Sequence, residues 1–95
     1  MVLGIVEGTI TSNQNSFDIP GGRYLLINKC NQAGKIKNEF LIALDLVSAG
    51  KNEMVMISES TSARETPTTR NKAVDAIIVG IIDKIDENDK VVYKK

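Results

Sequence analysis

One segment, residues 76–82, constrains the fold more than any other part of the sequence. It consists of Ala-Ile-Ile-Val-Gly-Ile-Ile, and no polar side chain interrupts it. β-Branched residues at this density favour a strand, and successive side chains of a strand point to opposite faces of the sheet. Both faces of this strand are therefore apolar. Because a chain of 95 residues has few spare elements to cover the outer face, the pattern predicts that a neighbouring subunit covers it.

Apolar residues alternating with a period of two predict strands in most of the remaining chain. The expected strands cover residues 2–10, 24–30, 40–46, 54–58 and 76–82, and residues 91–93 are a candidate for a short last strand. Five main strands with almost no helix indicate one all-β domain over residues 1–95. We expect this domain to fold as a small closed or partly closed five-stranded barrel.

The first two expected strands carry further signals. In residues 2–10 the glycines share a face with valines, which indicates a strand that coils tightly and lets other backbone approach closely. In the second strand, Leu25 and Ile27 lie on one face while Tyr24 and Leu26 lie on the other. This strand is also apolar on two sides, so it too predicts a neighbouring subunit.

Two segments between the strands have a different character. Ser62 and Glu65 have the spacing of a capping box and predict one short helical turn, which Pro67 keeps from extending. Residues 83–90 are rich in charge and resemble a calcium loop only in their carboxylates. The ligand spacing and the glycine of an EF-hand loop are absent, and two lysines lie inside the run, so we interpret it as a solvated turn.

The composition argues against several classes of function. Twelve Lys and Arg residues balance twelve Asp and Glu residues, and the formal net charge is zero. Proteins that bind nucleic acid phosphates usually carry a strongly basic surface, and binders of single strands add aromatic stacking platforms. Only 4% of the residues are aromatic. The same neutral balance does not oppose self-association.

Histidine is absent and Cys30 is the single cysteine, so the commonest metal ligand and general base are missing. We expect no metal, no cofactor and no enzymatic activity, and we interpret Cys30 as a small apolar core residue in a reduced compartment. The sequence contains neither an apolar run of membrane-spanning length nor a secretory leader. The expectation is a soluble cytoplasmic protein with no membrane partner.

Three charged residues are candidates for chemistry, and two of them lie next to apolar segments. Asp45 and Asp75 flank strands as a general acid and base pair does, but nothing else supplies a nucleophile or an oxyanion site. We therefore interpret them as caps of loop backbone amides. Arg64 follows a serine-rich turn and fits either an anion site or an ion pair across a subunit contact, of which we favour the ion pair. We expect the terminal residues Lys94 and Lys95 to be frayed.

Four segments resemble sequence motifs of the EutN/CcmL family of bacterial microcompartment vertex proteins. Residues 3–8 resemble the opening strand of that family, and residues 43–53 resemble its A-x-D-x-V-G-A-G-x-G-E signature. Residues 60–64 resemble its G-S-S-A-R turn, and residues 74–83 resemble its P-V-D-A-x-I-V-G-I-V-D strand. The resemblance runs in order along essentially the whole chain.

Several positions depart from these motifs. Ser48 and Asn52 stand where the family signature has glycines, residues 60–61 replace Gly-Ser, and Ala73 replaces a proline. Glycine adopts positive φ freely and serine does so poorly, whereas asparagine adopts it more readily. The departures therefore concern the shape of the loop after residue 45.

The resemblance implies an OB-like barrel that assembles as a ring of five identical subunits. Such a ring caps a vertex of a microcompartment shell and meets the hexameric shell proteins of the same compartment. The alternative is an OB-fold binder of single-stranded nucleic acid or oligosaccharide, a common role of that barrel; a small enzyme is a third hypothesis. The residues expected at subunit interfaces or in family motifs are Asp45, Ala49, Gly50, Glu53, Ser62, Ala63, Arg64, Asp75, Ile78 and Gly80.

Overall fold

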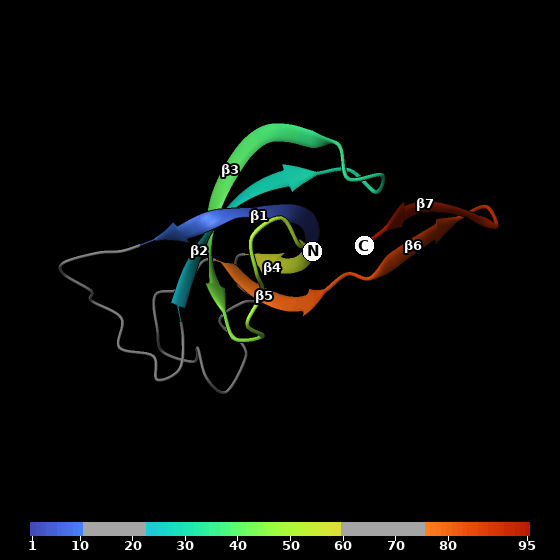
Figure 1. Ribbon diagram of the computed structural model, residues 1–95. Coiled ribbons are helices and arrows are strands. Elements are labelled where there is room, and N and C mark those ends of the chain that lie inside the picture. The colour runs from blue at the N-terminus through green and yellow to red at the C-terminus, as the bar shows by residue number, and fades with distance from the viewer. Residues whose placement is uncertain (11–22, 60–75) are drawn as a thin grey trace.

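The computed structural model describes residues 1–10, 23–59 and 76–95, which form a five-stranded barrel and a separate hairpin (Figure 1). The barrel strands are β1 (Val2–Ile10), β2 (Arg23–Cys30), β3 (Ile36–Asp45), β4 (Met54–Glu59) and β5 (Ala76–Ile81), and the hairpin strands are β6 (Lys84–Glu87) and β7 (Lys90–Lys94). The strand order around the closed barrel is β1-β2-β3-β5-β4. The prediction of an all-β fold built on a five-stranded barrel is confirmed.

The barrel is closed by one short parallel contact. β1 pairs antiparallel with both β2 and β4, β2 pairs antiparallel with β3, and β4 pairs antiparallel with β5. The remaining contact, between β3 and β5, is parallel and consists of the pairs Leu44 with Ile77 and Asp45 with Ile78. The end of β3 is therefore the place where the barrel closes.

β3 begins at Ile36, earlier than the expected start at residue 40. Lys37 and Glu39 alternate with Ile36 and Phe40, and all four side chains are exposed, so the apolar pattern there is weak. Pairing with β2 extends the strand regardless, because it satisfies backbone groups whatever the side chains are. The local alternation of apolar residues alone underestimated the strand.

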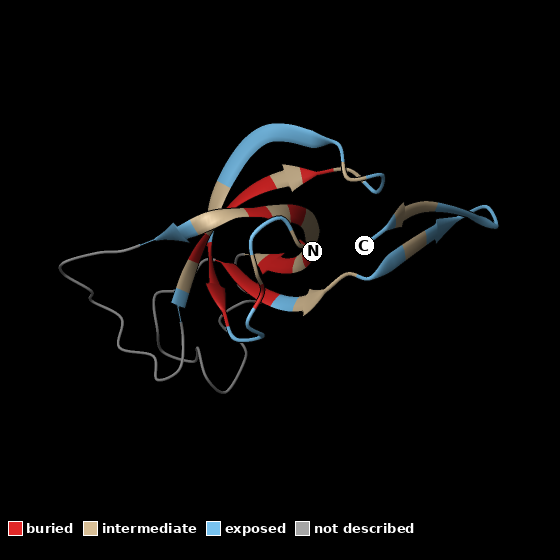
Figure 2. Ribbon diagram, viewed as in Figure 1, coloured by how far each residue is buried: buried red, intermediate tan, exposed pale blue. Residues whose placement is uncertain are grey.

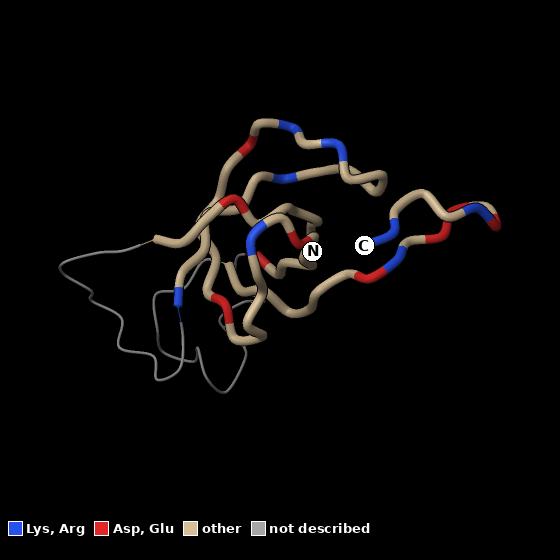
Figure 3. Tube along the Cα trace, viewed as in Figure 1, with Lys and Arg blue, Asp and Glu red and all other residues tan. Residues whose placement is uncertain are grey.

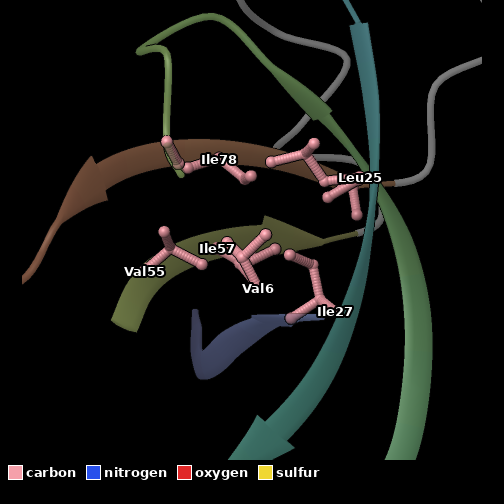
Figure 4. Packing of buried hydrophobic residues seen from close by; sticks show 9 residues of the cluster. Val6, Leu25, Ile27, Val55, Ile57 and Ile78 are labelled. Atoms are coloured by element: carbon pink, nitrogen blue, oxygen red, sulfur yellow. The ribbon is translucent and has the colours of Figure 1, made fainter. Parts of the chain in front are cut away.

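Apolar side chains from all five barrel strands fill the interior (Figure 4). The cluster consists of Val6, Leu25, Ile27, Ala43, Ala49, Val55, Ile57, Ala76 and Ile78. Leu25, Ile27, Ile57 and Ile78 are each at most 1% exposed. Burial of one such side chain contributes roughly 1.5–3 kcal/mol, so this cluster is the main source of stability.

Gly4 shows the close approach that the glycines of β1 predicted. A Cβ atom at Gly4 would lie 3.3 Å from the carbonyl oxygen of Asn28 and 2.3 Å from Cγ2 of Ile27, so a larger residue would force the Ile27 side chain to move. At Gly8 nothing lies within 4 Å of such an atom, and the prediction of close approach is wrong there. The reason is a bulge between Val6 and Gly8 that shifts the register with β2 and interrupts the alternation of faces.

The outer face of β5 is covered only in part within one chain. Ile77 is 3% exposed and packs with Leu44 and Tyr24 in a second cluster, whereas Val79 is 41% exposed. The expectation that a neighbouring subunit buries the whole outward set is therefore wrong for Ile77. Leu44 lies beside Ile77 in the parallel pair, and this neighbour in the same sheet shields it.

The charged segment 83–90 is a hairpin rather than only a turn, and this part of the sequence interpretation is corrected. Its turn is confined to Asn88 and Asp89, which have φ values of 53° and 65°. Two-residue hairpin turns of this type need positive φ at both positions, and asparagine and aspartate tolerate it. The hairpin projects away from the barrel, and most of its residues are exposed (Figure 2).

Several predictions concern residues 60–75, which lie outside the described residues. They are the short helical turn at residues 62–65 and the placements of Ser62, Ala63, Arg64 and Asp75.

Candidate functional site

The segment after β3, residues 45–53, is the part of the family signature that the structure describes, and Asp45 organises it. The Asp45 carboxylate is 2% exposed and accepts hydrogen bonds from the backbone amides of Val47 and Ala49, each at 3.0 Å. The prediction that Asp45 caps loop amides is confirmed. An acid or base for catalysis needs a free carboxylate at a cleft, and Asp45 is instead occupied by its own loop.

Arg23 completes this arrangement from the opposite strand. Its Nε donates to Oδ2 of Asp45 at 3.0 Å, and its Nη2 donates to the carbonyl oxygen of Ala49. The antiparallel register places Arg23 directly opposite Asp45. The sequence interpretation missed Arg23; the signal that could have found it is an arginine at the start of one strand facing an aspartate at the end of the next.

The loop adopts positive φ at both positions where this chain replaces a glycine of the family signature. Ser48 has φ of 61° and Asn52 has φ of 71°. The loop therefore has the backbone shape that glycine favours, although neither residue is a glycine. For a residue with a Cβ atom this left-handed conformation costs roughly 1–2 kcal/mol. The cost is smaller for asparagine than for serine, because the short polar side chain of asparagine can form a local hydrogen bond there.

Ser48→Gly is therefore expected to stabilise the protein. Ser48 is exposed, so no packing is lost. Relief of the strain minus the greater flexibility of glycine leaves a gain of about 0.5–1 kcal/mol in the free energy of unfolding. Urea denaturation measures it, with Asn52→Gly as the matched control expected to gain less. Equal stability of Ser48→Gly and the parent would contradict the strain at Ser48.

Glu53 closes the other end of the loop. Its side chain accepts hydrogen bonds from the backbone amide of Gly50 and from Nζ of Lys95. These contacts hold the pKa of Glu53 below its ordinary value, with the Lys95 hydrogen bond as the largest cause, and the same contact raises the pKa of Lys95. The Lys95 amide also donates to the carbonyl oxygen of Asp83 at 2.9 Å, so the expectation of a frayed Lys95 is wrong.

The contact between Glu53 and Lys95 makes a pH-dependent contribution to stability. Because the pKa of Glu53 is lowered in the folded protein, the contact adds to the free energy of unfolding above the ordinary carboxyl pKa near 4.5. This contribution is lost as the pH falls through the folded pKa of Glu53. Because the pKa of Lys95 is raised in the folded protein, the contact adds to the free energy of unfolding below the ordinary ammonium pKa near 10.5. This contribution is lost as the pH rises through the folded pKa of Lys95. The difference in Tm between the parent and Glu53→Gln should therefore be largest between these two pKa values and shrink below pH 4.5. A difference that does not depend on pH would contradict a stabilising contact between Glu53 and Lys95.

Main-chain hydrogen bonds tie the loop to β1. The Asn52 amide donates to the carbonyl oxygen of Val6 at 2.8 Å, and the Val6 amide donates to the carbonyl oxygen of Glu53 at 3.0 Å. Ala49 is 1% exposed and packs in the barrel core. The loop is thus a rigid extension of the barrel wall.

The sequence-predicted residues separate into three groups. The first group lies in the loop just described and consists of Asp45, Ala49, Gly50 and Glu53. Ile78 lies inside the barrel, so its side chain contacts the core of its own subunit. Gly80 lies on β5, where an added Cβ atom would meet Cε of Met56 at 3.4 Å, and the other four residues lie outside the described part.

The described residues present little that resembles a chemical centre. Within residues 1–10, 23–59 and 76–95 no group of three or more His, Cys, Asp or Glu side chains is placed to hold a metal ion. Cys30 is 4% exposed, as expected of an apolar core residue. Burial raises the pKa of its thiol, and the charge of Lys37 acts in the opposite direction. The same residues include no helix that could cross a membrane.

Comparison with known proteins identifies the family. The family model described as "Ethanolamine utilisation protein EutN/carboxysome" matches residues 1–83. The chain belongs to the EutN/CcmL family. The resemblance to this family is confirmed.

Individual members of the EutN/CcmL family match over nine tenths of this chain or more. The carboxysome shell vertex protein CcmL of Gloeobacter violaceus is 33% identical over 95 residues, which cover 100% of this chain and 95% of CcmL. The solved structure of that CcmL has a TM-score of 0.91 and covers 100% of this chain and 98% of its own. The pentameric microcompartment shell protein GrpN of Rhodospirillum rubrum is 29% identical, with a TM-score of 0.80 over 92% of this chain and 99% of GrpN.

Proposed function

We propose that this chain is a structural shell protein whose pentamers cap the vertices of a bacterial microcompartment in the cytoplasm. The observation that carries the proposal is the full-length similarity, in sequence and in fold, to the shell vertex protein CcmL. GrpN, which has the same fold, is described as a pentameric shell protein. In this proposal one barrel domain occupies residues 1–95, and its partners are further copies of itself and hexameric shell proteins of the same compartment.

The proposed role has a geometric reason. Flat hexagonal tiles cannot enclose a volume unless fivefold positions are introduced, so a closed shell needs pentamers at its vertices. A ring of identical subunits uses heterologous contacts, in which one surface of a subunit meets a different surface of the next. A rigid barrel with a braced loop suits this role because each subunit has to present both surfaces at a fixed angle.

Two measurements test the proposal. Light scattering of the purified protein at micromolar concentration should give a particle of five times the 10.4 kDa chain mass. Co-expression with hexameric shell proteins should give closed shells in electron micrographs, and omission of this chain should leave them open at the vertices. A stable monomer, or closed shells without the chain, would contradict the proposal.

We propose a structural rather than a catalytic role, since the family members are shell proteins and Asp45 serves its own loop. No observation favours the alternative of an OB-fold binder of single-stranded nucleic acid or oligosaccharide. A titration with a labelled oligonucleotide at low salt should show no binding, and saturable binding would revive that alternative.

A further inference from the structure

The β6–β7 hairpin depends on side-chain contacts with the barrel for its stability. Charged residues make up most of its two strands, and the exceptions are Ile85, Val91, Val92 and Tyr93 (Figure 3). Among the described residues no barrel strand pairs with the hairpin. A two-stranded hairpin is at best marginally stable alone in water. Contacts of its few apolar side chains with the barrel therefore have to hold it in place.

One face of the hairpin carries Ile85 and Tyr93 and is turned toward the barrel. These two residues are directly paired, and partners across antiparallel strands share a face. Both residues are half-buried, whereas Lys84 and Lys94 beside them are exposed. A register shift after Ile85 places Val91 on the opposite face, where it is 54% exposed.

The ring of Tyr93 packs on Gly34, in the turn between β2 and β3. A Cβ atom added at Gly34 would lie 3.2 Å from Cδ1 of Tyr93 and 3.5 Å from Cε of Met54. Hydrogen bonds within the turn make it a firm support. The Gly34 amide donates to the carbonyl oxygen of Asn31 at 3.0 Å, and the Ala33 amide donates to the Asn31 side chain at 2.9 Å.

Met54 is the buried partner in this contact. Val55 and Ile57 point into the barrel core, so Met54, one residue before Val55, points to the outer face of the sheet. Met54 is nevertheless 0% exposed. Its methyl group and the Tyr93 ring both lie against Gly34. The hairpin, the turn and β4 therefore share one small apolar cluster outside the barrel core.

Two polar contacts accompany this cluster. Nε2 of Gln32 donates to Oε1 of Glu87 at 2.9 Å, and Nζ of Lys95 contacts Glu53. Both contacts are exposed, so water competes for the same groups and each contact adds little to stability. The packing of Tyr93 is therefore the main attachment of the hairpin to the barrel.

We propose that Tyr93, Gly34 and Met54 form a latch that holds the hairpin at one angle to the barrel and opens without unfolding of the barrel. In the latched state, which the structure shows, the Tyr93 ring packs on the turn and Met54 is buried. In the released state the hairpin loses its support, and solvent reaches Met54. Segments with few buried contacts are the ones that open locally. The latch lies within one chain, so it does not depend on the proposed ring.

Oxidation of methionine by hydrogen peroxide measures the opening of the latch. Peroxide transfers one oxygen atom to the Met54 thioether, giving the sulfoxide and water, and peptide mass spectrometry of the full-length protein gives the rate. Tyr93→Ala should raise the oxidation rate of Met54 by about tenfold, because the latch opens more often. Met1, which is 75% exposed, is the internal reference for the activity of the peroxide.

Two control variants distinguish the latch from a general weakening of the hairpin. Val91→Ala is the matched control, since it truncates a side chain on the opposite face of the same strand. Tyr93→Phe keeps the aromatic ring that packs on Gly34. Both variants should leave the oxidation rate of Met54 at the value of the parent. An unchanged rate in Tyr93→Ala, or a rate in Val91→Ala as fast as in Tyr93→Ala, overturns the latch.

Hydrogen exchange shows which part of the chain opens. In Tyr93→Ala the amides of residues 84–94 should exchange about tenfold faster, while the core amides of Val55 and Ile57 keep the rates of the parent. Gln32→Ala should accelerate exchange less than Tyr93→Ala, because its contact with Glu87 is exposed. Equal acceleration in barrel and hairpin, or a larger effect of Gln32→Ala than of Tyr93→Ala, overturns the latch.

Discussion

Ile78→Asp is expected to prevent folding of the barrel itself. Ile78 is 1% exposed and packs in the main core cluster, where a carboxylate has no hydrogen-bond partner. An unpaired buried charge costs several kcal/mol, against a stability of about 5–15 kcal/mol for a whole domain. Circular dichroism and urea denaturation should show an unfolded or severely destabilised chain.

The adjacent position provides the control for that experiment. Val79 is 41% exposed, so Val79→Asp should leave the barrel folded, with a small change in the free energy of unfolding. If Ile78→Asp unfolds cooperatively with a midpoint close to that of the parent, the placement of Ile78 in the core is wrong.

Asp45→Ala is expected to have the second largest effect. The substitution leaves the amides of Val47 and Ala49 without their acceptor and removes the partner of the Arg23 guanidinium. Each buried donor left unpaired costs about 1–3 kcal/mol, so we expect the free energy of unfolding to fall by about 3 kcal/mol. Urea denaturation with an unchanged m-value measures this loss.

Two further variants separate the roles within this group of contacts. Arg23→Ala should cost less than Asp45→Ala, because the Arg23 side chain is 48% exposed and water replaces part of its contact. Asp45→Asn should recover only part of the loss, since an amide has a single acceptor oxygen for donors on both sides. A loss below about 1 kcal/mol in Asp45→Ala would contradict the bracing of the loop.

The sequence was sufficient to predict those features that depend on residues close together along the chain. Alternation of apolar residues located the five barrel strands, and the position of Asp45 at a strand end indicated its capping role. These features depend on neighbours within a few residues, which the order of side chains displays directly. The comparison with the family signature drew attention to the shape of the loop at Ser48 and Asn52, and both residues have positive φ.

Only the tertiary structure decided features that depend on distant partners. Arg23 meets Asp45 across 22 positions and Lys95 meets Glu53 across 42, and neither pair has a local signal. The long start of β3 and the β6–β7 hairpin exist because backbone pairing stabilises strands whose side chains are largely charged. Ile77 is covered by its own chain because the barrel closes beside Leu44. Alternation therefore determines which residues can lie in a strand, whereas the closure of the sheet determines which faces remain open to a neighbour.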